Sequence, residues 1–284
     1  APARWWAMTI GLCTDSSSQL PPDLAARYGI EVVPVSVRIG DEEYLEGVDL
    51  DADRFYALYR GGERPVVTTT QPSSGQYAVA FDELLARGCT EIVSIHVAST
   101  VSGSMNAARL AAHQMGVPVR LVDSGTTGFA VACATWAAAD AVVAGADIDT
   151  VVAAAEGVGP SVGNVFVVGA LELLGERDAA GSCAVPVLGL RDGQVQVIGR
   201  STDVDHAVGS MQGYLEAWQA TAGGRLRVAI GVADARVAPL GAALATAIGS
   251  SPQVDDVVGF RLGPSAGSHT GPGTVSCFMF PTAT

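Results

Sequence analysis

Residues Ile92–Met115 read IVSIHVASTVSGSMNAARLAAHQM and contain one complete unit of the fold. The apolar run Ile92–Val97 has the length and composition of a buried strand, and Ser104–Met115 has the apolar spacing of an amphipathic helix. The Ser/Thr/Gly-rich segment between them predicts a turn that leads directly into the helix. Units of this kind recur along the whole chain, which predicts an α/β protein with largely parallel sheets.

The same reasoning places the other elements. In the first half we expect strands at Met8–Leu12, Glu31–Ile39 and Val119–Val122, and helices at Asp51–Arg60 (with Asp51 as the N-cap), Gly75–Arg87 and Thr127–Gly145. In the second half we expect strands at Val165–Gly169, Val185–Leu190, Gln194–Ile198, Leu226–Val232, Val257–Leu262 and Thr274–Phe280. The remaining helices are expected at Asp147–Gly159, Asp203–Ala222 and Ala235–Ile248. The pair Asp192-Gly193 predicts a hairpin turn.

Two domains are expected from the length of 284 residues. The Gly-Val-Gly-Pro sequence at 157–160 ends a predicted helix, and a strand follows it. We therefore predict an N-terminal α/β domain at 8–158, with a mainly parallel sheet, and a smaller C-terminal α/β domain at 159–284.

The charged residues exclude several functions. The net charge is −13, so most of the surface would repel a nucleic acid backbone, and nucleic acid is not an expected partner. The 16 basic residues are all arginines, so the chain can contain neither a Walker A lysine nor a Schiff-base lysine. Base composition of the genome is the simplest cause of this absence, but the chemistry is excluded in either case.

The five cysteines lie far apart, with no CxxC pair and no histidine at ligand spacing. This pattern is typical of a reduced, cytoplasmic protein, and it predicts neither a disulfide framework nor a metal site. The apolar stretch Phe129–Ala146 contains Asp140, which favours a buried helix over a membrane span. No cofactor and no stable membrane insertion are expected.

Three segments of the first half, 68–74, 99–104 and 123–127, are rich in Ser, Thr and Gly and each precedes a predicted helix. At the carboxyl ends of parallel strands, such turns meet where ligands bind, and helix N-termini offer N–H groups to an anion. The three segments contain neither Arg nor His, which favours a monoanionic carboxylate over a phosphate. The alternative is that these hydroxyls only cap helices.

The segment Gly267–Gly273 is the candidate of the second half. Its glycines and Pro272 predict an irregular backbone that presents His269 to a ligand. The nearby Gly263–Gly267 matches GxSxG around Ser265, but we expect no helix after that serine, as a nucleophile elbow would need. The other histidines lie within predicted strands or helices, where core or surface roles are expected.

Five segments, in this order, resemble motifs of the DegV family of fatty-acid-binding proteins. Cys13–Ser17 contains the TDSS sequence, Thr69–Ser73 is similar to TSQPS, and Ser99–Ser104 is similar to SxLSGT. Val122–Ser124 resembles a strand-terminal DS, and His269–Gly273 reads HTGPG. The sequence differs from the family at Glu176–Gly181, where relatives have a Gly-Gly-Arg-Ile turn.

The resemblance implies a two-domain DegV-like fold with a long-chain fatty acid lying between the domains. It also implies that the bound acid is presented to a separate fatty acid kinase, which forms an acyl phosphate. The carboxylate-binding residues implied are Thr69, Thr70, Ser102, Gly103, Ser104, His269 and Arg200, with Ser16, Asp123 and Ser124 as further loop candidates.

Two alternatives stay open. A serine hydrolase or acyltransferase would use Ser102 or Ser265 with His269. A phosphotransferase acting alone is disfavoured by the absence of lysine and of an acidic metal-binding cluster.

Overall fold

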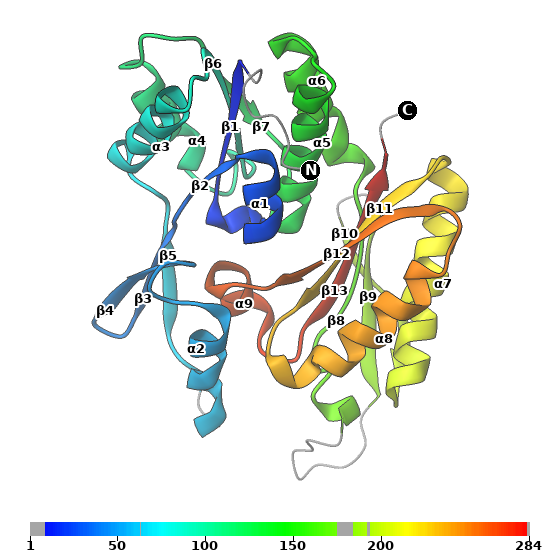
Figure 1. Ribbon diagram of the computed structural model, residues 1–284. Coiled ribbons are helices and arrows are strands. Elements are labelled where there is room, and N and C mark those ends of the chain that lie inside the picture. Colours follow the sequence, from blue (N-terminus) through cyan, green and yellow to red (C-terminus); the bar gives the residue numbers. More distant parts are fainter. Residues whose placement is uncertain (1–8, 63, 175–183, 192–193, 283–284) are drawn as a thin grey trace. The chain divides into compact units, whose positions relative to one another are not determined.

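The computed structural model describes residues 9–62, 64–174, 184–191 and 194–282, and the chain divides into two compact units (Figure 1). The first unit combines the residues up to Asp49 with Thr68–Pro160, and the second combines Leu50–Val67 with the residues from Ser161 onward. The sequence placed 50–67 in the N-terminal domain, whereas the structure places it in the second unit. The two units contain equal numbers of residues. The mixed α/β class is confirmed.

The first unit is built on a parallel sheet. Its strands are β1 (Ile10–Asp15), β2 (Glu31–Val33), β6 (Glu91–His96) and β7 (Val119–Asp123), in the order β2-β1-β6-β7. The predicted single strand Glu31–Ile39 is wrong, because the chain leaves this sheet at Pro34 and continues as β3 (Ser36–Ile39). Pro has no N–H to donate to a sheet, so it interrupts the strand.

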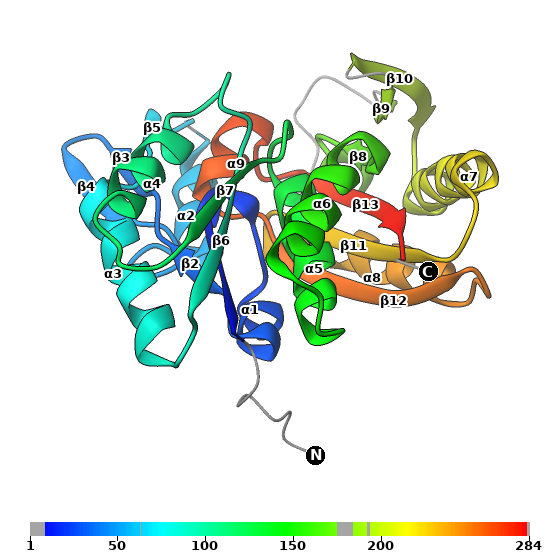
Figure 2. The same cartoon turned by 90° about the horizontal axis from the view of Figure 1, so that it is seen from above.

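Helices cover both faces of this sheet (Figure 2). On one face, α3 (Ser74–Ala86) and α4 (Ser104–Ala112) share a core with Cys13 and Ile92. On the other face lie α5 (Phe129–Val143) and α6 (Ile148–Val158). The short α1 (Pro22–Tyr28) was not predicted. Among the described residues, no helix has the length and hydropathy needed to cross a bilayer.

A separate three-stranded sheet has the order β4-β3-β5, with β4 at Glu42–Leu45 and β5 at Val67–Thr70. The sequence did not indicate β4, and it predicted a turn that begins at Thr68. Thr68–Thr70 therefore form the end of an edge strand rather than a turn, and they do not follow a strand of the parallel sheet. Exposed threonines suit such an edge, because β-branched residues are favoured in strands.

The second unit contains a six-stranded sheet of order β10-β9-β8-β13-β11-β12, in which only β11 and β12 pair in parallel. The largely parallel pairing expected from the sequence thus holds for the main sheet of the first unit alone. The strands are β8 (Gly163–Val167), β9 (Val185–Arg191), β10 (Gln194–Ser201), β11 (Leu226–Val232), β12 (Val254–Arg261) and β13 (Val275–Pro281).

The predicted pairing of β9 with β10 is antiparallel, as a hairpin requires, and Asp192-Gly193 itself lies outside the described residues.

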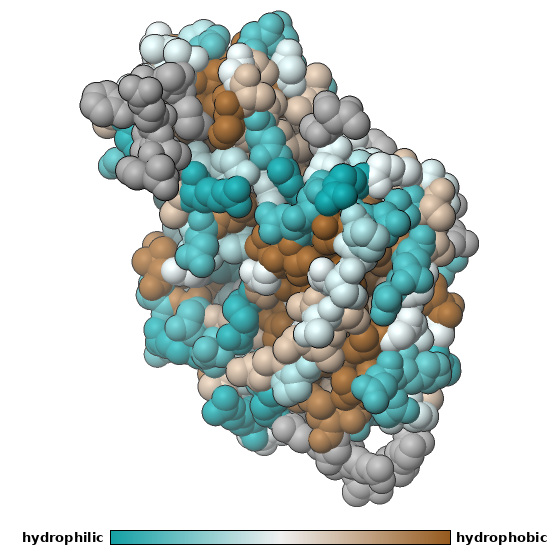
Figure 3. Space-filling view, turned by 45° about the vertical axis from the view of Figure 1, so that its right-hand side comes forward, coloured by the Kyte–Doolittle hydropathy of each residue, from teal (hydrophilic) through white to brown (hydrophobic). Residues whose placement is uncertain are grey.

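The large apolar side chains exposed in the second unit include Leu190, Val195, Val197 and Ile198 of β9 and β10. Both hydrophobic and hydrophilic residues reach the surface on the face drawn in Figure 3.

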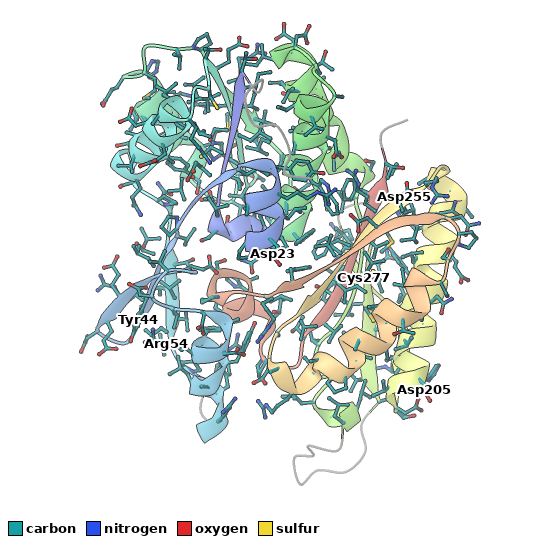
Figure 4. The ribbon with its side chains drawn as sticks, in the orientation of Figure 1. Asp23, Tyr44, Arg54, Asp205, Asp255 and Cys277 are labelled. Carbon is teal, nitrogen blue, oxygen red and sulfur yellow. The ribbon has the colours of Figure 1, made fainter. Side chains whose placement is uncertain are left out.

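Helices α7 (Val204–Ala222) and α8 (Ala238–Gly249) pack on the six-stranded sheet. Cys277 lies on β13 inside this core (Figure 4), and burial raises the pKa of its thiol to about 12. The thiol is therefore protonated and unreactive at neutral pH.

Leu50–Val67 belongs to the second unit because α2 (Ala52–Ala57) packs on α9 (Pro264–Thr270). The ring of Tyr56 lies so close to Gly267 that a Cβ there would collide with it. Arg261 Nη2 contacts Asp53 Oδ1 at 2.8 Å, and Arg64 donates to the Ser268 carbonyl at 2.7 Å. The Asp51 cap is present as predicted, with its side chain accepting from the Arg54 N–H.

Candidate functional site

The strand order of the parallel sheet has a switch point between β1 and β6. From β1 the chain moves to β2 on one side and later returns to β6 on the other side of β1. Ligands of α/β proteins bind at the carboxyl ends of the strands at such a point. Asp15 ends β1 and His96 ends β6, so the segment 97–103 after β6 lies at the switch point.

Hydrogen bonds join the three predicted segments within the first unit. The Gly103 N–H donates to Gln71 Oε1 at 3.0 Å, which links the first segment to the second. The Ser99 N–H lies 3.2 Å from Asp123 Oδ2, and the Ala98 N–H donates to the Thr126 carbonyl at 2.8 Å. The structure thus brings together segments that are separated along the sequence.

Ser102 and Ser104 form a pair of hydroxyls at the start of α4. Their oxygens lie 3.1 Å apart, and Ser102 Oγ also accepts from the Ser104 N–H at 3.2 Å. Ser104 is buried, whereas Ser102 is half-buried. Gly103 is the N-cap residue, so its N–H lies at the positive end of the helix dipole. The pair and this N–H are uncharged donors suited to one carboxylate group.

Thr69 and Thr70 are exposed on β5. In the described part of the chain, neither threonine forms a hydrogen bond with the Ser102 segment, and Gln71 makes the connection instead. Gln71 was part of a quoted motif but was not predicted as a site residue. An exposed glutamine carries no signal in a single sequence.

A buried polar network lies beneath the serine pair and was not predicted. Tyr77 donates to Asp15 Oδ2 at 2.9 Å and lies 3.5 Å from His96 Nδ1, while Ser94 Oγ lies 2.9 Å from His96 Nε2. Against the larger effect of burial, the Ser104 side chain lowers the pKa of the Tyr77 hydroxyl, so the two residues are neighbours. The network therefore lies next to the serine pair, and solvent does not reach its side chains.

Burial determines the protonation states in this network. It lowers the pKa of His96 to about 4, against opposing charges on Asp15 and Asp123, so the imidazole is neutral at pH 7. Burial and the Asp15 charge raise the pKa of the Tyr77 hydroxyl. Because Tyr77 gives its only proton to Asp15, the contact with His96 requires the imidazole proton on Nδ1.

The further loop candidates have internal partners. Ser16 donates to Glu46 Oε2 at 2.6 Å and accepts from the Val35 N–H at 3.0 Å. Ser124 Oγ accepts from the backbone N–H and the hydroxyl of Thr126. These contacts hold each serine to neighbouring groups of the first unit.

Asp123 is also a turn anchor. Although partial burial opposes its ionisation, hydrogen bonds from Ser99 and Gly125 lower the pKa of its carboxyl. The charged group would repel a ligand carboxylate beside it, which places the stronger candidates at Ser102 and Gly103.

The expectation of an irregular backbone around His269 is wrong. Residues Pro264–Thr270 form helix α9, which begins with Pro264 at its first turn and ends at Gly271 with φ +82°. His269 lies exposed in the last turn. A helix does contain Ser265, contrary to our expectation, but the serine is its second residue rather than part of the preceding turn, unlike a nucleophile elbow.

Arg200 lies on the edge strand β10 and donates to the Ala184 carbonyl at 3.3 Å. In the described residues, it forms no hydrogen bond with His269. The motif difference at Glu176–Gly181 lies outside the described residues. Within the described ranges, no three His, Cys, Asp or Glu side chains are grouped as metal ligands.

Residues 9–177 match the family described as "Uncharacterised protein, DegV family". The chain belongs to the DegV family. A DegV domain-containing protein of Streptomyces coelicolor is 30% identical over 274 residues, covering 93% of this chain and 95% of the relative. A second, from Deinococcus radiodurans, is 29% identical and covers 96% and 99% of the two chains.

Solved DegV structures have the same fold. A Thermus thermophilus DegV family protein, described by its fatty acid binding, superposes with a TM-score of 0.77 at 27% identity, covering 96% of this chain and 99% of that one. DegV from Bacillus subtilis, described as a fatty acid binding protein, has a TM-score of 0.77 at 22% identity, with 97% and 100% covered. The similarity to the Bacillus subtilis protein shows a shared fold and nothing more.

Proposed function

We propose that this chain binds a long-chain fatty acid whose carboxylate is held by Ser102 and the Gly103 N–H, with Thr69 or Thr70 as a further donor. The observation that carries the proposal is the meeting of the 68–74 and 99–104 segments at Gly103, at the switch point of the sheet. The full-length likeness to the Thermus thermophilus protein supports the choice of ligand.

The acyl chain and the head group contribute differently to binding. Burying one methylene is worth about 0.8 kcal/mol, so about 14 methylenes contribute about 11 kcal/mol before ordering costs. Hydrogen bonds to the charged head group, at about 1.5–3 kcal/mol each, offset its loss of hydration. The acyl chain therefore supplies the affinity, and the donors of the first unit select and orient the carboxylate. The roles of His269 and Arg200, and the place of the acyl chain between the domains, stay predictions.

We further propose that the bound acid is presented to a separate fatty acid kinase. The chain has no lysine to contact nucleotide phosphates, so phosphoryl transfer is assigned to the partner. A cytoplasmic location completes the proposal. It is supported by Cys13, Cys89 and Cys277, which are free thiols in the described part of the chain.

Lipid extraction tests the ligand. The protein is purified from a bacterial host and denatured, and the extract is analysed by mass spectrometry, where fatty acid is expected in near-equal amount to protein. An empty extract, together with no uptake of added palmitate or oleate, would contradict the proposal. Labelling of Ser102 or Ser265 by a fluorophosphonate would favour a hydrolase instead.

A substitution tests the head-group site. Ser102→Ala is expected to weaken palmitate binding about tenfold, since it removes one hydrogen bond to a charged group. Thr100→Ala in the same loop is the matched control, because Thr100 is exposed and has no assigned role. Equal affinities of the two variants would place the carboxylate elsewhere.

A further inference from the structure

The side-chain amide of Gln71 lies over the backbone of Gly103. Gln71 Oε1 accepts from the Gly103 N–H at 3.0 Å. A Cβ on residue 103 would lie 2.5 Å from Oε1, 2.7 Å from Nε2 and 2.9 Å from Cδ of this amide. Only glycine therefore leaves room for the whole planar group at this position.

An amide and a carboxylate have the same shape. Each is a planar carbon bearing two heteroatoms, and in each an oxygen accepts from a donor such as the Gly103 N–H. The Gln71 amide thus stands where the proposed ligand carboxylate would stand. The Gly103 N–H has one proton, so the amide and a carboxylate compete for it.

We propose that Gln71 is an internal competitor that sets the affinity of the carboxylate site. This inference rests on the proposed function. In the ligand-free chain the amide satisfies the Gly103 donor, and an ionised carboxylate displaces it because a charged acceptor forms the stronger hydrogen bond. Gln71 is exposed, so the displaced amide hydrogen-bonds with water. A lipid without a charged head group gains no comparable advantage over the amide.

The test measures palmitate binding by calorimetry with delipidated protein. Gln71→Ala is expected to bind about three- to tenfold more tightly, the equivalent of one neutral hydrogen bond that no longer has to be displaced. Gln71→Asn keeps the amide on a shorter side chain that cannot reach Gly103, and it should behave like Gln71→Ala. Gln71→Glu places a tethered carboxylate on the donor and should weaken binding at least tenfold at pH 7.5.

Gln114→Glu is the charge control. Gln114 is exposed, has no assigned role, and follows α4 in the same unit. The palmitate affinity of Gln114→Glu should stay within twofold of the affinity of the unchanged protein. A ligand-free readout accompanies these measurements, because Gln71→Ala should shift the Gly103 amide resonance and accelerate its hydrogen exchange.

Weaker binding by Gln71→Ala would overturn the inference, since Gln71 would then hold the two segments in place for the ligand. Equal palmitate affinities of Gln71→Ala, Gln71→Glu and the unchanged protein would also overturn the inference. The proposed function would stand in that case, because the unchanged protein would still bind palmitate. Palmitate binding by Gln71→Ala, with no measurable binding by the unchanged protein, would support the inference. Absence of binding in every variant would overturn the proposed function, and the inference with it.

Discussion

The Tyr77 hydroxyl donates a hydrogen bond to Oδ2 of Asp15 across 2.9 Å, and both side chains are buried. These residues come from α3 and β1 and lie 62 positions apart in the sequence. The Asp15 carboxylate also accepts from the Ser17 N–H at 3.0 Å. A buried carboxylate needs such donors, because an unpaired one is strongly destabilising.

Tyr77→Phe should therefore lower the free energy of unfolding by about 1–3 kcal/mol, since it removes one donor from a buried acceptor. Urea denaturation followed by circular dichroism measures the change. Tyr44→Phe, on β4 (Figure 4), makes the same change at an exposed hydroxyl and should cost less than about 0.5 kcal/mol. Equal losses in the two variants would remove the assigned role of Tyr77.

His96 should make stability fall in mild acid. Burial lowers its pKa to about 4, below the ordinary value of 6.5, so the unfolded chain binds the proton more readily than the folded one. Its contribution is complete above pH 6.5 and is lost as the pH falls toward 4, with a total of about 3 kcal/mol.

The measurement is the free energy of unfolding between pH 4 and pH 8 for the unchanged protein and for His96→Gln. The difference between the two curves isolates the histidine from Asp15, Asp123 and Arg109, the charged groups that act on it. Parallel curves would show that His96 has the same pKa in the folded and unfolded states.

Gly267→Ala should destabilise the second unit by about 1–3 kcal/mol, because its methyl group would press on the Tyr56 ring. Alanine in a helix is otherwise favoured over glycine, so Gly213→Ala in α7, where nothing lies within 4 Å, should stabilise by about 0.5–1 kcal/mol. Thermal denaturation shows whether each variant is more or less stable than the unchanged protein. A gain in both variants would mean that α2 does not pack tightly on α9.

Cys277 and Cys13 should resist thiol reagents in the folded protein. Both are fully buried, and burial raises the pKa of each thiol, so little thiolate forms at pH 8. Among the cysteines that the structure describes, Cys89 is only partly buried and should be labelled first. Peptide mapping after brief treatment with a maleimide locates the modified residues. Early labelling of Cys277 would contradict the buried position of β13.

The local pattern of apolar residues was sufficient to predict the long helices and strands. The strand Leu226–Val232 has the predicted bounds, and α7 begins one residue after its predicted start, because each combines a continuous apolar pattern with clear ends. Helix α9 was missed because a seven-residue segment with Gly, Ser and Pro has no apolar period, and its packing on Tyr56 decides its conformation. Tertiary contact overrides propensity in such segments.

The candidate site was predicted in part. The turn at Ser102–Ser104 followed from the strand and helix around it, and the structure places it at a switch point. The partners that act on it were not predictable, because Gln71, Asp15 and Tyr77 reach it through pairings distant in sequence. One signal was present: Ser94 and His96 alternate within an apolar strand, which places both on one face.

The return of Leu50–Val67 to the second unit has a consequence for truncation. A fragment ending at residue 158 would carry α2 without α9, so Phe55 and Tyr56, both buried in the whole chain, would lose the surface that covers them. A fragment beginning at residue 159 would in turn leave Gly267 uncovered. A single cut between residues 158 and 159 therefore yields two fragments with exposed apolar surface that are prone to aggregate, rather than two independently folding domains.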